Sequence, residues 1–145
     1  MPARGYYRSA GLTPLHGLLL AFPVALFTGT VATDITYLNT GEMQWTNFSA
    51  WLNAAGLVFA GVVILWALVD AVLARRRGGL SGALVYLGVL VVMWIVGLIN
   101  AFHHSGDAWS SVGTLGLVLS IVTALLALVA GWMLYARPAV RSEVL

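Results

Sequence analysis

The sequence contains no cysteine and very little charge. Only 8% of its 145 residues are charged, whereas a soluble domain carries about 25%. Without cysteine the chain cannot form a disulfide or hold a zinc ribbon or an iron–sulfur cluster by itself. With so few charged residues it cannot cover a water-facing surface with polar groups. These absences exclude disulfide-rich proteins, thiolate metal proteins and ordinary soluble domains.

The sequence also lacks a catalytic signature. It has no Ser/His/Asp nucleophile set, no phosphate-cradling glycine loop and no paired catalytic carboxylates. Gly78 and Gly79 indicate a turn, and no neighbouring motif supports phosphate binding there. The basic residues form no face interleaved with aromatics, so no nucleic-acid partner is indicated. The sequence favours a non-enzymatic protein without deciding the question.

Long hydrophobic runs make up most of the chain, which is 61% hydrophobic. Four apolar blocks, roughly 15–38, 48–73, 80–102 and 109–135, are separated by short polar segments. Each block has about 20 or more residues, enough for a helix to cross about 30 Å of hydrocarbon. The alternation typical of a membrane barrel is missing. The sequence predicts an all-α fold, a single transmembrane domain over residues 1–145 that is a bundle of four helices.

The basic residues are confined to one side of the predicted membrane. All seven are arginines, in the N-terminal tail, the second loop and the C-terminal tail. They are Arg4, Arg8, Arg75, Arg76, Arg77, Arg137 and Arg141. The first and third loops contain none. The positive-inside rule therefore predicts that both chain ends face the cytoplasm, an N-in/C-in topology.

His16 and Asp70 are the ionisable residues nearest the cytoplasmic ends of the first two spans. Since these spans are antiparallel, the two residues have matching depth, and a hydrogen bond between them is expected. Ionisable groups inside a membrane are costly and usually face the bundle interior. The pair is a candidate for proton handling or ligand binding; the alternative is a polar pair that only orients two helices.

A second polar cluster lies near the outer ends of the spans and contains Asp34, His103, His104 and Asp107. Histidine and carboxylate residues together can bind a divalent metal. However, adjacent histidines point to different helix faces, and His-x-x-x-His spacing is absent. We therefore predict no metal site and interpret this cluster as solvated interfacial polarity.

Two asparagines inside the apolar blocks, Asn53 and Asn100, are candidates for helix packing. In a membrane such a hydrogen bond across helices contributes about 0.6–2 kcal/mol. Helical periodicity places polar and small residues on one face of each of the first two spans: His16, Pro23, Phe27, Thr30 and Asp34 on the first, and Asn53, Gly56, Ala60 and Ala67 on the second. These faces are predicted to meet, either as a packing interface held by a few polar contacts or as a path through the bundle that is lined by polar side chains.

No cofactor is required by the sequence. A haem held by two histidines needs them at matching depth on facing helices. Here His16 is near the inner surface, and His103 and His104 are near the outer surface. A haem between two copies, or one with a single histidine ligand, stays open as an alternative.

Several short motifs together resemble a bacterial family of predicted four-helix integral membrane proteins, a domain of unknown function. They are Pro14-Leu15-His16, Phe22-Pro23-Val24-Ala25-Leu26, Asp34, Thr40-Gly41-Glu42-Met43-Gln44-Trp45, Ala50-Trp51-Leu52-Asn53-Ala54-Ala55-Gly56, Asp70, Trp109 and Gly131-Trp132. The resemblance implies a multi-pass protein of the bacterial inner membrane, in a family sometimes linked with redox proteins. The chain departs from it at Gly17, where members often have proline, and at Tyr86, where many carry a histidine.

Three functions follow as expectations. The first is a non-enzymatic accessory or scaffold subunit of a bacterial membrane complex, with a redox complex as one option that the resemblance suggests. The second is an electron-transfer subunit that binds haem or quinone through His16 and Asp70. The third is an oligomeric transporter of protons, ions or small solutes. Besides the lipid bilayer, we expect a second copy or other membrane subunits as partners, with at least one of Trp66, Trp94 and Trp132 facing another protein.

The topology is tested by cysteine labelling, because the natural chain has no cysteine that could react with the reagent. Cysteine at Gly41 or Ser105 should react with an impermeant thiol reagent on intact cells, and cysteine at Gly78 should not. The opposite labelling pattern would show that the chain ends face outward.

Overall fold

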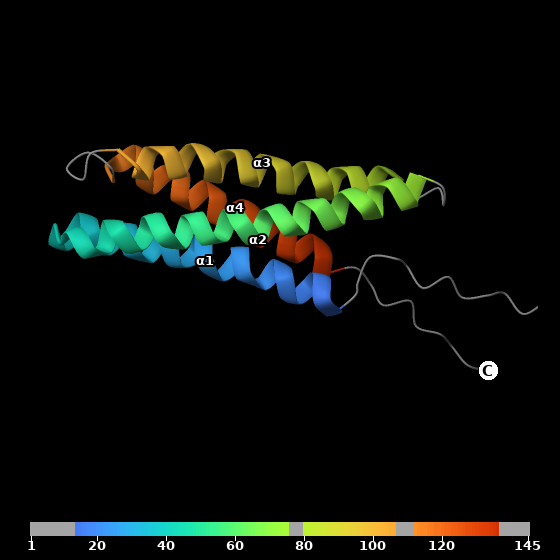
Figure 1. The fold of residues 1–145 in the computed structure, drawn as a ribbon, viewed down its shortest axis with the longest axis horizontal. Helices are drawn as coiled ribbons and strands as arrows, with labels where there is room; N and C mark the ends of the chain where they lie inside the picture. Colours follow the sequence, from blue (N-terminus) through green and yellow to red (C-terminus); the bar gives the residue numbers. More distant parts are fainter. Residues whose placement is uncertain (1–13, 76–79, 107–111, 137–145) are drawn as a thin grey trace, which may run out of the picture.

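The computed structural model describes residues 14–75, 80–106 and 112–136, and these residues are almost entirely helical. The helices are α1 (Pro14–Thr40), α2 (Met43–Arg75), α3 (Leu80–His104) and α4 (Thr114–Tyr135) (Figure 1). Each is long and apolar enough to cross a membrane. In lipid, helices satisfy their backbone groups internally, which explains why these apolar blocks are helical. The predicted all-α bundle of four membrane spans is confirmed.

The helix ends differ from the expected bounds where the chain turns. α1 and α2 join at Gly41, whose φ of 68° lies in the left-handed region that glycine tolerates. The Gly41 N–H donates to the carbonyl of Tyr37 at 2.8 Å and so caps α1. The polar stretch expected to be a loop is therefore mostly helical. α4 begins at Thr114, and Trp109, its expected start, lies outside the described residues.

The helices pack in a ring. α1 contacts α2, α2 contacts α3, α3 contacts α4, and α4 contacts α1. Within the described residues the diagonal pairs, α1 with α3 and α2 with α4, have no close backbone contacts. Consecutive helices are antiparallel, so α1 and α3 run in the same direction, and α1 begins at the end of the bundle where α4 ends (Figure 1). We call this the His16 end and the opposite one the His104 end.

The buried residues of α1 and α3 recur at alternating spacings of four and three residues, as in a coiled coil. On α1 they include His16, Leu20, Pro23, Phe27, Thr30 and Asp34, and on α3 they are Tyr86, Leu90, Met93, Gly97, Asn100 and His104. At both ends of the bundle a side chain of α1 meets the side chain 70 positions later on α3. The two helices therefore present matching stripes to each other along the whole bundle.

The core is polar towards the His104 end and apolar from the middle towards the His16 end. The fully buried apolar side chains include Leu20, Phe27, Val63, Leu90 and Met93. Of the buried polar residues in the described helices, all except His16 lie towards the His104 end: Thr30, Asp34, Thr46, Ser49, Asn53, Asn100, His104, Ser120 and Thr123. The bundle thus has a polar half closed off by an apolar half.

The faces predicted for the first two spans do meet. Gly56 of α2 lies against the ring of Phe27 of α1, and both are buried. A larger side chain does not fit at position 56, because an added Cβ would lie 2.6 Å from Phe27 Cε1. Close approach through small residues is how helices pack where no hydrophobic force joins them.

Gly56→Ala should therefore destabilise the bundle by about 1–3 kcal/mol, because the Phe27 ring must move in a packed core. The matched control is Gly61→Ala on the same helix, where the nearest atom to an added Cβ, Trp94 Nε1, is 3.8 Å away. That variant should be neutral or slightly stabilising. Unfolding by a denaturing detergent, followed by tryptophan fluorescence, measures both. Equal stability of the two variants would contradict this packing.

Candidate functional site

A histidine and an aspartate join the diagonal helices α1 and α3 at the His104 end. His104 Nε2 lies 3.0 Å from Asp34 Oδ1, and the two side chains are 1% and 0% exposed. Because the backbones of α1 and α3 are not in close contact, these side chains cross the centre of the bundle. The expectation that both are solvated at the interface is wrong, since both lie on the buried stripes of their helices.

Two further residues complete a network around this pair. The Ser120 hydroxyl of α4 donates to Asp34 Oδ2 at 2.5 Å. Asn100 donates its amide Nδ2 to Ser120 Oγ at 2.9 Å, and its backbone carbonyl lies 2.9 Å from His104 Nδ1. We call Asp34, Asn100, His104 and Ser120 the Asp34 network. It ties α1, α3 and α4 together by hydrogen bonds between fully buried groups.

The hydrogen-bond partners determine how many protons the pair of His104 and Asp34 holds. A carbonyl oxygen only accepts, so His104 Nδ1 carries a proton. The contact between Nε2 and Asp34 Oδ1 then requires one further proton, on the imidazole or on the carboxyl group. In either form the pair has zero net charge. A pair without net charge is far less costly to bury than an isolated carboxylate, which explains how Asp34 can be fully buried.

The order of the groups argues against nucleophilic catalysis at this site. In a catalytic triad the histidine stands between the serine and the carboxylate and takes the serine proton. Here Asp34 stands between Ser120 and His104, and both imidazole nitrogens of His104 already have other partners. The arrangement therefore holds a proton but does not activate the Ser120 hydroxyl through the histidine.

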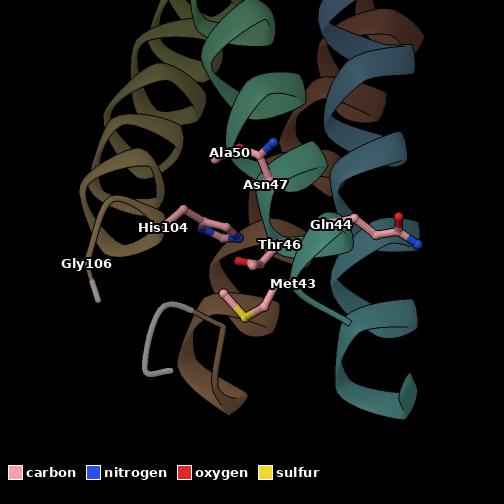
Figure 2. Close-up of a pocket in the computed structure, with 7 residues that line it drawn as sticks. All are labelled: Met43, Gln44, Thr46, Asn47, Ala50, His104 and Gly106. Atoms are coloured by element: carbon pink, nitrogen blue, oxygen red, sulfur yellow. The ribbon is translucent and has the colours of Figure 1, made fainter. Parts of the chain in front are cut away.

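A pocket of about 450 Å³ lies at the His104 end and reaches this network. It is lined by Met43, Gln44, Thr46, Asn47, Ala50, His104 and Gly106. Figure 2 shows His104 pointing from α3 towards Thr46 at the start of α2. Through His104, the pocket connects the buried Asp34 carboxyl group with the end of the bundle.

Comparison with known families agrees with this fold. Residues 12–134 match the family model described as "Predicted membrane protein (DUF2231)". The chain belongs to this family. No match was found among curated proteins or among solved structures. The family description gives a membrane location and assigns no function.

At the opposite end of this DUF2231 protein, His16 makes a second diagonal link. Its Nε2 lies 2.9 Å from the Tyr86 hydroxyl of α3, and both residues are buried. Its ring also meets Trp66 edge-on at 5.7 Å. The sequence did not predict Tyr86 as a partner. Asp70 is half-buried near the end of α2, and its expected interaction with His16 stays a prediction.

The remaining candidate residues have separate places. Asn53 donates to the carbonyl of Gly97 at 3.1 Å, so it joins α2 to α3. His103 is half-buried, and its Nε2 has no hydrogen-bond partner among the described residues. Asp107 lies outside the described residues. Within the part of the chain that the structure describes, no three His, Cys, Asp or Glu residues are grouped as metal ligands.

The Asp34–His104 pair is tested by a double-mutant cycle. Asp34→Ala or His104→Ala alone leaves the other member of the pair buried without the Nε2–Oδ1 contact, which should cost about 3–5 kcal/mol of unfolding free energy. The double variant should cost less than the sum of the two, by about 0.5–3 kcal/mol. Glu42→Ala, at an exposed position, is the control and should change stability by at most about 0.5 kcal/mol. Strictly additive costs would show that the pair is not coupled.

Proposed function

We propose that this DUF2231 protein is a non-enzymatic accessory subunit of a bacterial inner-membrane complex, in which the Asp34 network holds a proton near the outer face. The observation that carries the proposal is the pocket that leads to His104 and, through it, to the fully buried Asp34. With N-in/C-in topology the His104 end faces outward. In support, Arg75 ends α2 at the opposite end, and the other arginines belong to segments that adjoin that end in the sequence.

The packing of the core supports a site that is open to one face of the membrane, and it argues against a transport path through a single chain. Between the Asp34 network and His16, the bundle centre is filled by fully buried apolar side chains such as Leu20, Leu90 and Met93. Solutes or ions cannot cross such layers without separating the helices. A transporter would need a path between several copies, for which the described residues give no direct support.

The electron-transfer alternative is also less well supported by the histidines. His104 uses both ring nitrogens within the bundle, and the Nε2 of His16 bonds to Tyr86. The two residues stand at opposite ends of the bundle, so they do not fit a haem held by two histidines. Ligation of haem or a hydrogen bond to a quinone would first have to break one of these contacts.

A role as a subunit is supported by the outward surface. Trp132 of α4 is 76% exposed, whereas Trp66 and Trp94 are half-buried and Trp94 donates to the carbonyl of Leu57. Trp132 is therefore the tryptophan that we propose to face another subunit. Large aromatic side chains dominate many protein contacts, and a lipid-facing position would leave this one without a specific partner.

The proposal is tested by native mass measurement after purification in a mild, lipid-like environment. The wild-type chain should co-purify with a membrane subunit in fixed stoichiometry, and Trp132→Ala should weaken that association by about tenfold or more, the effect of a single strong contact residue. Trp51→Ala, which removes an equally exposed tryptophan near the other end, should leave it unchanged. A wild-type chain that stays monomeric and without a partner at every protein-to-lipid ratio would overturn the proposal.

A further inference from the structure

Two buried amide oxygens in the polar half of the core have no donor among the described residues. Asn53 and Asn100 are both 0% exposed, and each uses its amide nitrogen in a hydrogen bond. The side-chain carbonyl oxygen Oδ1 of each has no hydrogen-bond partner in the described part of the chain. An unsatisfied buried acceptor costs about 1–3 kcal/mol. Such groups in a folded protein generally have a partner, often a buried water.

The two asparagines are close to each other through α3. Asn53 bonds to the carbonyl of Gly97, and Asn100 is one helical turn further along the same helix. The hydroxyl of Thr123, which lies beside Gly97, does not supply a missing donor, because it donates to the carbonyl of Leu119 in its own helix. The unsatisfied oxygens therefore belong to one region, beside the Asp34 network to which Asn100 is bonded.

We infer that water enters through the pocket at His104 and reaches this region, where it donates to the Oδ1 atoms of Asn53 and Asn100. The site is a one-sided aqueous half-channel that ends at the apolar layers around Leu90 and Met93, which are both 0% exposed. The pocket volume of about 450 Å³ is ample for several waters, since each occupies about 30 Å³ in the liquid. The role of this water path rests on the proposed function: it would exchange protons between the Asp34 network and the outer face.

Single-cysteine labelling in lipid vesicles tests the half-channel. Thr123→Cys places a thiol at a 0% exposed position beside Gly97, and Ala127→Cys places one at an equally buried position a turn further along α4. A thiol reacts as the thiolate, which requires water. A small, water-soluble methanethiosulfonate added at the His104 side should modify Thr123→Cys faster than Ala127→Cys by about tenfold or more. The unfolding transition of each variant checks that it is folded.

Filling the pocket mouth tests the route. Ala50 is a half-buried pocket residue, and Ala50→Phe combined with Thr123→Cys should slow the labelling severalfold. Unchanged labelling would overturn entry through the pocket. If neither cysteine of the first pair reacts in folded protein, the region is dry and the inference fails; if both react equally, the apolar closure fails. The same labelling in the Trp132→Ala background should be unchanged, so failure of the subunit proposal would remain distinguishable.

Discussion

In lipid, a buried polar group must find its partner inside the protein, and the contact between Asp34 and His104 meets this constraint across the diagonal of the bundle. α1 and α3 lie on a diagonal without close backbone contacts, so only side chains in matching register can join them. That register requires the parallel direction of the two helices and the same stripe of buried positions on each. The ring order of the helices and their rotation are thus tied to this one interaction.

At both ends of the bundle a histidine links α1 to α3, but the surroundings of the two links differ. At each end a histidine crosses the diagonal between α1 and α3, to Tyr86 at one end and to Asp34 at the other. Among the described residues, the Asp34 end combines a fully buried carboxyl group with a pocket and further polar layers. Apolar layers separate the two links. This asymmetry supports the proposal of a proton site that is reached from one face.

The sequence predicted the four spans, and helical periodicity predicted the buried faces of α1 and α2, because lipid leaves an apolar block few alternatives to a helix. It did not predict that Asp34 meets His104. Short loops identify neighbours along the chain, whereas a diagonal partner depends on how each helix is rotated. Ser120 was missed because a lone serine in an apolar block has no distinguishing neighbour. Tyr86 was not expected as the partner of His16 because a charged residue, Asp70, lies at the same depth on the neighbouring helix.

Asp34 and His104 share one proton in their buried contact, and His104 Nδ1 carries a second proton. Solid-state NMR of protein labelled with nitrogen-15 in histidine and carbon-13 in aspartate, in lipid bilayers, measures this directly. We expect a protonated His104 Nδ1 and a through-space correlation between His104 Nε2 and the carboxyl carbon of Asp34, and both signals should disappear in His104→Ala. A His104 with an unprotonated Nδ1, or with no correlation to Asp34 in folded protein, would contradict it.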